Sequence, residues 1–356
     1  MSQSDATTTR TPIGHVLGIA LALAAVVAVI VLAFSWPSVT ADPEDLPIAI
    51  AGPAEAISAA EDAVDEQSPG AIAFLEVDDR DAAVEAIETR HAYGAILLGT
   101  EPEVLTSSAS SLAVAQLLGT VAGQLEAGVN ARAAAAAQAK GAPAAPPHID
   151  VEVTDVVPLA DTDPRGAGLT VALFPLVLGG IAISIAVIGA MRRVTAVLVY
   201  SAVGGLALTG ILQGWFGALQ GDYWLNSAAI ALALAAIATT ITGLAALMGR
   251  AGIAVGAVVM LLFANPISAA AVPKEFLLAP WGEVGQWFPP GAAATLIREL
   301  SYFPSADMAF PWLVLAAWAA GGILLSVVGH FRTAGGAEPD AEASVAESDA
   351  EASVAV

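Results

Sequence analysis

The stretch Ile13–Trp36, IGHVLGIALALAAVVAVIVLAFSW, runs for 24 residues without Asp, Glu, Lys or Arg. A helix needs about 20 predominantly apolar residues to cross the hydrocarbon core of a bilayer, so this stretch predicts a transmembrane helix. Five further apolar runs lie within Gly166–Phe331, after an insert of about 130 residues that reads as a water-exposed domain. This spacing predicts a mainly α-helical membrane protein with six transmembrane helices, one (13–36) before the insert and five after it.

The composition also indicates a membrane protein. Hydrophobic residues make up 57% and charged residues 13% of the 356-residue chain, whereas soluble proteins carry roughly 25% charged residues. The formal net charge is −22, and residues 37–165 alone contain 22 acidic against 5 basic residues. So acidic a chain is not expected to bind nucleic acid or anionic lipid surfaces. No cysteine is present, which excludes disulfides and thiolate chemistry.

The basic residues predict the orientation of the chain in the lipid bilayer, because short loops rich in Arg and Lys stay in the cytoplasm. The loop Gln220–Asn226 between the third and fourth spans contains neither type. The arginines that flank or separate the other spans are Arg10, Arg192, Arg193, Arg250 and Arg332. We therefore expect a multi-pass protein of the bacterial inner membrane with the insert outside. Residues 1–12 form a cytoplasmic N-terminus, and residues 332–356 a disordered acidic cytoplasmic tail.

The first span is consistent with an uncleaved anchor or with a cleaved signal peptide. Val39-Thr40-Ala41 is an acceptable cleavage motif of small residues. The apolar core of a signal peptide, however, is about 7–15 residues long, and the run over residues 13–36 is longer. The length favours an anchor.

Residues 37–165 predict a small extracytoplasmic α/β domain, since short apolar strands alternate with amphipathic helices. The expected strands are Leu46–Ala51, Ala71–Val77, Ala95–Leu98, Val104–Ser108 and Ile149–Val157. The expected helices are Ala54–Gln67, Arg80–Arg90 and Leu112–Lys140, the last of them ended by Pro143, Pro146 and Pro147. This alternation favours a mainly parallel sheet.

The insert contains no recognisable catalytic or metal-binding motif. Its two histidines, His91 and His148, lie far apart in the sequence and in different elements. An acidic cluster at one strand-to-helix turn consists of Glu76, Asp78, Asp79 and Asp81. Carboxylates at such a turn either bind a hard cation such as calcium or cap the following helix, and we favour the capping role. The prediction is a protein that is not an enzyme and holds neither metal nor cofactor.

A transport function would require energy from another subunit. The chain has two lysines, Lys140 and Lys274, and neither lies in the G-x-x-x-x-G-K-[ST] motif of an ATP-binding loop. Four predicted spans contain no charged residue, namely Leu169–Met191, Thr195–Leu219, Ser227–Gly249 and Ala251–Ala271. Ion-coupled transporters usually place ionisable residues within their membrane spans, because these residues must bind the ion.

Glycines four residues apart predict close helix packing in two of these spans. The pairs are Gly210/Gly214 and Gly252/Gly256. Each pair fits a contact between two copies of the chain as well as a contact within one bundle. Both interpretations are consistent with the sequence.

The segment Val272–Met308 between the last two spans contains too many prolines, glycines and charges for a spanning helix. Its large apolar side chains, Trp281 and Trp287 among them, favour the membrane interface. Pro280 and the pair Pro289-Pro290 divide the segment into two short pieces. We therefore expect an outer re-entrant loop at 272–308 within a five-helix transmembrane bundle formed by residues 166–331.

Several motifs in this region resemble the last extracytoplasmic loop of type-2 ABC transporter permeases. They are Asn265-Pro266-Ile267-Ser268, Pro280-Trp281, Gly285–Gly291 (GQWFPPG), and Leu296-Ile297-Arg298 followed by Tyr302-Phe303. In the insert, Ala82–Ile87 and Tyr93–Ile96 resemble the first outer domain of the phage-infection-protein (Pip)-like branch of that superfamily. The resemblance covers nearly the whole chain except the acidic tail. The insert is shorter than in many such proteins, and no clear amphipathic coupling helix precedes the first span.

The resemblance implies a homodimer that works with a separate cytoplasmic ATPase subunit and exports a hydrophobic or amphiphilic compound, such as a lipid, a drug or an envelope precursor. It implies six candidate residues along the exit path of that compound: Asn265, Trp281, Gln286, Trp287, Arg298 and Tyr302. The tryptophans also fit a role as interface anchors, and Arg298 fits an ion pair with Glu299, Glu283 or a lipid phosphate. A different function fits the sequence as well, a non-transporting envelope scaffold or receptor whose extracytoplasmic domain binds a partner.

Overall fold

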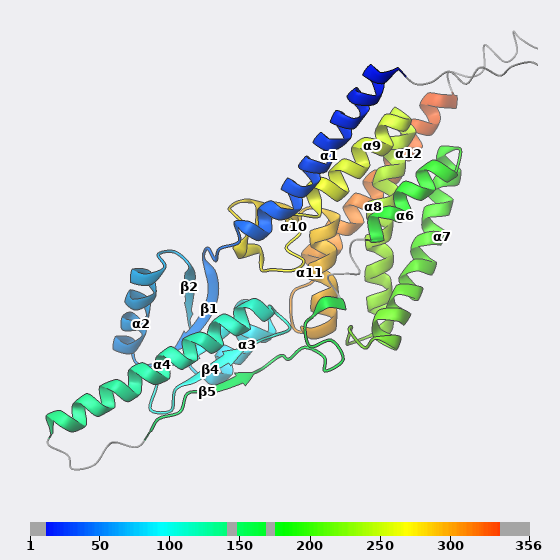
Figure 1. The fold of residues 1–356 in the computed structure, drawn as a ribbon. Coiled ribbons are helices and arrows are strands. Elements are labelled where there is room, and N and C mark those ends of the chain that lie inside the picture. The colour runs from blue at the N-terminus through cyan, green and yellow to red at the C-terminus, as the bar shows by residue number, and fades with distance from the viewer. Residues whose placement is uncertain (1–11, 141–147, 169–174, 335–356) are drawn as a thin grey trace, which may run out of the picture.

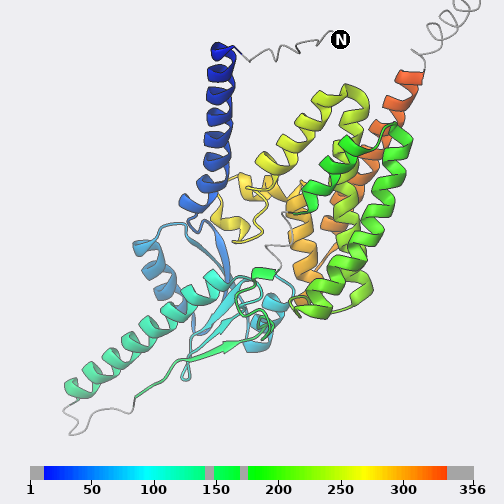
Figure 2. The same ribbon diagram turned by 45° about the vertical axis from the view of Figure 1, so that its right-hand side comes forward.

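The computed structural model describes residues 12–140, 148–168 and 175–334. Figure 1 shows two parts, an α/β part built around residues 46–155 and a helical bundle formed by α6–α12. The first helix, α1 (Ile13–Val39), leads into the α/β part, and its N-terminal part stands apart from the bundle helices in Figure 2. The expected segment before residue 12 and the expected tail after residue 334 lie outside the described residues.

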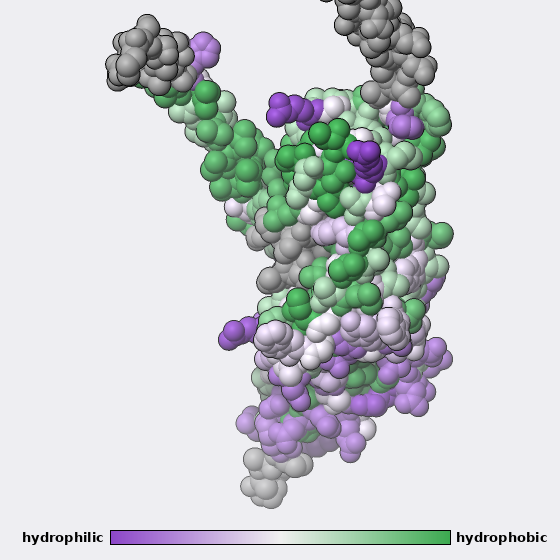
Figure 3. Space-filling model, turned by 90° about the vertical axis from the view of Figure 1, so that its right-hand side faces the viewer, coloured by the Kyte–Doolittle hydropathy of each residue, from purple (hydrophilic) through white to green (hydrophobic). Residues whose placement is uncertain are grey.

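The molecule is mainly helical, and its apolar helices are those of a membrane protein. Among the described residues, five helices are long and apolar enough to cross a bilayer: Ile13–Pro37, Leu112–Ala139, Ala190–Trp215, Tyr223–Met248 and Ala309–Arg332. In Figure 3, hydrophobic residues cover the upper part of the molecule, including α1, and hydrophilic residues gather at the lower end over the α/β part. The prediction of a multi-pass membrane protein is therefore confirmed.

One of these five helices belongs to the α/β part, as the sequence predicts. Four of the five lie where the sequence predicts a span. The fifth is α4 (Leu112–Ala139), which packs Val114, Leu118 and Ala122 against the sheet of the α/β part. Its apolar composition therefore reflects contact with the sheet along its first half and the alanine-rich sequence of its second half.

Two predicted spans occur only as shorter apolar helices, Val177–Ala186 and Arg250–Ala264. Residues 169–174, where the first of these was expected to begin, lie outside the described part of the chain. The second extends over about 22 Å at 1.5 Å per residue, less than the hydrocarbon thickness of about 30 Å. It ends in a turn that contains Pro266, which lacks the backbone donor that a further helical turn needs.

α8 (Tyr223–Met248) is the centre of the bundle, and the helices around it are α6 (Pro175–Ala186), α7 (Ala190–Thr209), α9 (Arg250–Ala257), α11 (Pro289–Tyr302) and α12 (Ala309–Ala334). Two π-helical segments, η1 (Gly210–Trp215) and η2 (Val258–Ala264), continue α7 and α9. The backbones of α8 and α12 approach closely, since a Cβ on Gly322 would lie 2.4 Å from the carbonyl carbon of Thr239. At the same place Thr239 Oγ1 donates to Ala319 O at 3.2 Å.

The two glycine pairs have different surroundings. A Cβ on Gly252 would lie 2.0 Å from Leu244 O, and one on Gly256 would lie 3.0 Å from Ile241 Cα, both in α8. This pair therefore packs inside the chain's own bundle. A Cβ on Gly214 would meet no described atom within 4 Å, so the face around Gly214 is open.

The α/β part contains a five-stranded sheet of order β2-β1-β3-β4-β5. The strands are β1 (Leu46–Ala51), β2 (Ile72–Glu76), β3 (Gly94–Leu97), β4 (Glu103–Thr106) and β5 (Glu152–Asp155), each within one or two residues of a predicted strand or inside one. Neighbouring strands are parallel except β3 and β4. Only residues 98–102 connect those two, too few for the crossover of a dozen or more residues that a parallel pair requires.

Helices cover both faces of this sheet (Figure 1). Because successive strand residues point to opposite faces, Leu46 and Ile48 pack with α4, whereas Ala49 packs with α3 (Arg80–Glu88) through Ala83 and Ile87. The remaining helix, α2 (Ala54–Gln67), connects β1 to β2. The α/β part thus has two small apolar cores, one on each side of the sheet.

The acidic cluster before α3 caps that helix, as predicted. The carboxylate of Asp79 accepts a hydrogen bond from Ala82 N at 2.9 Å. The next residue, Arg80, forms a two-pronged ion pair with Glu103 of β4, with N–O distances of 2.8 and 3.0 Å. Hydrogen bonding from Arg80 lowers the pKa of the Glu103 carboxyl below its ordinary value.

The segment between η2 and α12 is divided into short helices at the prolines, as the sequence predicts. It begins with a short 3-10 turn, η3 (Lys274–Phe276). α10 (Trp281–Gln286) starts directly after Pro280, and α11 starts at the Pro289-Pro290 pair. α11 is buried along most of its length, and its neighbours are α8 and α12.

Candidate functional site

Five side chains lie where the α/β part meets the bundle, and we call them the junction: Arg90, Tyr93, Glu275, Glu299 and Phe303. Backbone hydrogen bonds join the same two parts. Asp42 N donates to Phe276 O at 3.2 Å, and Glu44 N donates to Glu275 O at 2.9 Å. The chain that leaves α1 is therefore bonded to the η3 turn that precedes α10.

Tyr93, at the start of β3, lies on the α/β side of the junction. Its hydroxyl donates to the carboxylate of Glu275 at 2.8 Å, and its ring belongs to the core between α4 and the sheet. Burial, reinforced by the charge of Glu275, raises the pKa of the Tyr93 hydroxyl. Tyr93 therefore remains a hydrogen-bond donor over the physiological pH range.

A buried charge pair joins the end of α3 to α11. Arg90 adopts the left-handed backbone conformation, with φ of 62°, and its Nε lies 3.7 Å from Glu299 Oε1. Its guanidinium carbon lies 5.1 Å from the centroid of the Phe303 ring. The side chains of Arg90 and Glu299 are only 16% and 8% exposed, and within the described residues Arg90 Nη1 and Glu299 Oε2 have no hydrogen-bond partner.

Burial raises the pKa of Glu299 to about 7, against the opposing charge of Arg90. A buried pair of this kind costs free energy unless every polar atom is satisfied. Groups with such perturbed pKa values are enriched at functional sites, so the surroundings of this pair are a candidate functional site.

A cavity of about 80 Å³ lies next to the junction and is lined by both parts of the molecule. We call it the junction cavity. Its polar lining consists of Ser108, Ser110 and Ser111 before α4, Asp163 and Arg165 in the connection from β5 to the bundle, and Arg298 and Tyr302 of α11. Three stretches that are distant in sequence therefore supply one polar site.

Positive charge prevails in the junction cavity. Its two arginines, Arg165 and Arg298, share it with one carboxylate, Asp163, whose oxygens accept backbone N–H groups of residues 167 and 168 at 3.0 and 2.8 Å. Burial lowers the pKa of Arg298 to about 10, so this guanidinium still carries its charge at neutral pH. The planar donor fork of arginine matches carboxylate and phosphate oxygens, and the cavity is therefore suited to a small anionic group.

Two of the six predicted path residues, Arg298 and Tyr302, lie together in the junction cavity. Arg298 Nη2 donates to Ala270 O at 2.9 Å, and the Tyr302 hydroxyl donates to Ala218 O at 2.9 Å. The other four do not line this cavity. Of the ion-pair partners considered for Arg298, Glu299 pairs with Arg90, and Glu283 pairs with Lys274.

Gln286 and Asn265 hold the turn that follows η2. Gln286 is buried, with its Nε2 donating to Ser268 O at 3.3 Å and its Oε1 accepting from Thr295 Oγ1 at 2.7 Å. The backbone carbonyl of Asn265 accepts from Ser268 Oγ at 2.7 Å. The contacts of the Gln286 side chain fix the turn against α10 and α11 and indicate a structural role for Gln286, whereas Asn265 contributes a backbone carbonyl.

The two predicted tryptophans belong to two groups of aromatic rings, one formed by Phe263, Trp281, Phe288 and Trp318 and the other by Trp287 and Phe310. Trp281 contacts Phe263 edge-on at 5.9 Å between ring centroids. Trp287 is 63% exposed and contacts Phe310 edge-on at 5.0 Å. Exposed tryptophan at the end of an apolar bundle is typical of interface anchors.

Sequence reasoning does not find the Arg90–Glu299 pair, because the two residues approach each other only through the docking of α3 onto α11. One signal is nevertheless present. Arg90 is one of only 5 basic residues among 22 acidic residues in positions 37–165, and it lies at the boundary between a helix and a strand. A basic residue so outnumbered by acids is a reasonable candidate for a specific pair.

Comparisons of the chain with protein-family models, with curated proteins and with solved structures found no match. What the protein does must therefore be inferred from its own geometry.

Proposed function

We propose that the chain is the membrane-spanning permease subunit of an ABC-type exporter, which moves a hydrophobic or amphiphilic compound across the bacterial inner membrane and is powered by a separate cytoplasmic ATPase. The observation that carries this proposal is the junction cavity, where Arg298 and Tyr302 of the apolar bundle lie with polar groups of the α/β part. A molecule with a polar head and an apolar tail suits a site at which polar and apolar surfaces adjoin.

The proposed topology has six spans, with both termini in the cytoplasm and the α/β part outside. α6 and the α9–η2 helix serve as the two shorter spans, and α4 stays with the sheet. The helix ends that carry Arg192, Arg250 and Arg332 lie at the end of the bundle remote from the α/β part (Figure 1), which supports this orientation. The loop Gln220–Asn226, which lacks basic residues, follows the opposite end of α7.

The charge of the junction cavity limits which head group the exported compound can carry. Although the chain as a whole is strongly acidic, Arg165 and Arg298 outnumber Asp163 here. A phosphate or carboxylate complements two guanidinium groups, and the volume of about 80 Å³ restricts the site to a small group. We therefore propose an amphiphile with a compact anionic head as the exported compound.

The segment 272–308 is proposed to enter the outer leaflet, with Trp281 and Trp287 as interface anchors. The burial of α11 against α8 and α12 supports this, because irregular backbone at membrane depth must be shielded by protein. We place the contact between the two copies of a homodimer on the open face around Gly214.

The first experiment is affinity purification of the tagged chain in mild detergent, followed by mass spectrometry of the associated proteins. An exporter subunit should bring down a stoichiometric ATPase, and the purified chain should increase the ATP turnover of that ATPase. Recovery of envelope proteins without any ATPase would contradict the export function and support the scaffold or receptor function instead.

A second experiment tests the junction cavity itself. Arg298→Ala should abolish the stimulation of ATP turnover by an anionic amphiphile in proteoliposomes, whereas Arg298→Lys, which keeps the charge, should retain part of it. Arg132→Ala is the matched control, because Arg132 is an exposed arginine of α4 away from the cavity. Equal stimulation in Arg298→Ala and in the control would contradict the role of the cavity.

A further inference from the structure

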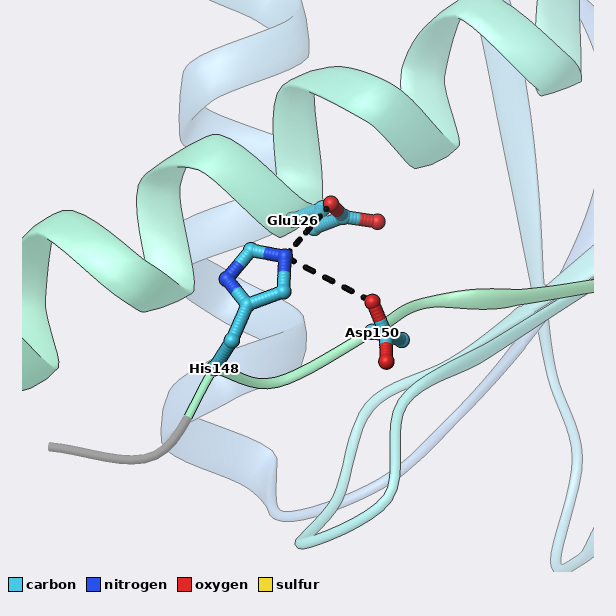
Figure 4. Close-up of side chains that lie close together, drawn as sticks. All are labelled: Glu126, His148 and Asp150. Carbon is cyan, nitrogen blue, oxygen red and sulfur yellow. Dashed lines mark hydrogen bonds and ion pairs between the residues drawn. The ribbon is translucent and has the colours of Figure 1, made fainter.

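A cluster of three potential metal ligands lies at the far end of the α/β part. Glu126 comes from α4, and His148 and Asp150 come from the segment that leads into β5 (Figure 4). His148 Nε2 lies 3.1 Å from Glu126 Oε1 and 3.4 Å from Asp150 Oδ1. One imidazole nitrogen and two carboxylate oxygens from separate stretches of the chain therefore converge on one point.

Hydrogen bonds around the cluster hold α4 and the segment before β5 together. Asn130, one helical turn after Glu126, binds Ile149 twice, since its Oδ1 accepts from Ile149 N at 2.9 Å and its Nδ2 donates to Ile149 O at 2.8 Å. The second oxygen of Glu126 accepts from Val151 N at 3.3 Å. The residues on either side of Asp150 are thus fixed to α4, and the three ligands are positioned by the fold.

The ligand types and distances fit a tetrahedral divalent cation better than a simple ion pair. Imidazole nitrogen suits zinc and its neighbours in the first transition series, and the ligand distances of zinc are about 2.0–2.2 Å. In a tetrahedron of that size, ligand atoms lie about 3.3–3.5 Å apart. The two distances from His148 Nε2, 3.1 and 3.4 Å, are close to this, and all three ligand atoms lie within 4.8 Å of one another. A single imidazole N–H cannot bond two carboxylates equally well.

We propose that Glu126, His148 and Asp150 form a binding site for Zn²⁺, with water at the fourth position. Asp150 is 88% exposed and His148 is 62% exposed, so the ion has direct access and the fourth position faces solvent. The site is independent of the junction cavity and of the proposed export function.

The position of the site indicates what bound zinc does. The buried residues of α4 are Val114, Leu118 and Ala122, all in the first half of the helix, so its second half makes little use of the core. Zinc links that second half to the chain entering β5. The ion therefore stabilises α4 just beyond the last of its buried residues, at the middle of the helix.

The sequence does not indicate this site because its ligands are not closely spaced in one motif. Glu126 lies within a helix of alanine-rich sequence, and residues 141–147 intervene before His148. The prediction of a protein without a metal site is the expectation that this proposal would overturn.

The test is calorimetric titration of the full-length protein, purified in detergent and freed of metal by chelation, with Zn²⁺ alone. We expect one Zn²⁺ per chain, with affinity reduced at least tenfold in His148→Ala and in Asp150→Asn. His91→Ala is the matched control, because His91 is an exposed histidine of the same part whose ring nitrogen bonds to Thr89. Unchanged Zn²⁺ affinity in His148→Ala, or equal loss in the His91→Ala control, would overturn the proposal.

Two further measurements define the ion and its effect. Co²⁺ should give the intense visible absorption of a four-coordinate site in the wild type and lose it in His148→Ala. Amide exchange in the second half of α4 should slow when Zn²⁺ is added. Binding of Ca²⁺ or Mg²⁺ with no response to Zn²⁺ or Co²⁺ would overturn the assignment to zinc.

Discussion

The contact between α8 and α12 and the junction between the α/β part and the bundle bring separate segments together by different chemistry. At the first, Gly322 lies against the backbone of Thr239, and the described hydrogen bond is a neutral one from a hydroxyl to a carbonyl. At the second, the ionisable side chains of Arg90 and Glu299 are buried against each other, and an atom of each has no hydrogen-bond partner within the described residues.

The difference shows which interactions stabilise each contact. Close packing of small residues maximises van der Waals contact and leaves no charge to desolvate. A buried ion pair, in contrast, is weak evidence for stability, because desolvation offsets the attraction. The α8–α12 contact is therefore best understood as scaffold, and the junction as a place where ionisation and position of the two parts are linked.

The largest effect is expected from removing one partner of the junction pair. At pH 8, where Glu299 is ionised, Arg90→Ala leaves this carboxylate buried without its cation, which should lower the free energy of unfolding by about 3 kcal/mol. Reversible denaturation in mixed micelles measures this, with Arg132→Ala as the exposed control. The double replacement Arg90→Met with Glu299→Met should recover most of the loss. If the double variant is no better than Arg90→Ala, desolvated charge is not what makes the junction sensitive.

Overpacking the α8–α12 contact should have the next largest effect. Gly322→Leu places a side chain against the backbone of α8 and should lower the free energy of unfolding by about 1–3 kcal/mol. The adjacent Gly321 is the matched control, because a Cβ there would meet no described atom within 4 Å. Thermal unfolding in detergent should therefore separate Gly322→Leu from Gly321→Leu. Similar melting temperatures in both variants would show that the approach of α8 and α12 is not tight.

The junction should make stability depend on pH, which the α8–α12 contact should not. The pKa of Glu299 is about 7 in the folded protein against an ordinary value of 4.5, so the folded state binds more protons between these values. Stability contributed by the neutral carboxyl is therefore lost as pH rises from about 4.5 to 7.

Melting temperatures measured over this range should fall with pH in the wild type and fall less in Glu299→Gln. The slope should be unchanged in Gly321→Leu, which leaves Glu299 in place. The same pH slope in Glu299→Gln and in the wild type would assign the dependence to other groups.

The smallest effect is expected from one hydroxyl of the α8–α12 contact. The Thr239 hydroxyl lies 2.7 Å from Ala235 O within α8 and 3.2 Å from Ala319 O of α12, so Thr239→Val removes both contacts and should lower the free energy of unfolding by about 0.6 kcal/mol, the average for interhelical bonds in membranes. Thr242→Val is the control, because the buried hydroxyl of Thr242 bonds to Thr239 O within α8 itself. A larger loss in the control than in Thr239→Val would contradict this account of the contact.

Local patterns predict much of this fold. The bounds of β1 and α2 follow directly from an apolar run and a helical period, and Asp79 caps α3 as its position at the turn indicates. The antiparallel pairing of β3 with β4 is not predicted by strand alternation, because it depends on the short connection between them. The role of α4 is also ambiguous from composition, since a helix packed on a sheet and a spanning helix are both apolar.

The candidate site is predicted less completely than the fold. Arg298 and Tyr302 are found because they lie one helical turn apart in a recognisable motif, and the structure brings them into one cavity. Arg90 and Glu299 are missed because only tertiary docking makes them neighbours. Gln286 is found as a polar residue, but its two hydrogen bonds to the chain give it a structural role.

The hydrogen bonds from Asp42 and Glu44 to the η3 turn have a mechanical consequence. α1 has none of its most apolar window buried in the molecule, so the surrounding lipid, through its thickness, governs the tilt of this helix. Only a few residues separate the end of α1 at Val39 from these hydrogen bonds. A change in the tilt of α1 would therefore be transmitted over a few residues to the η3 turn and the start of α10.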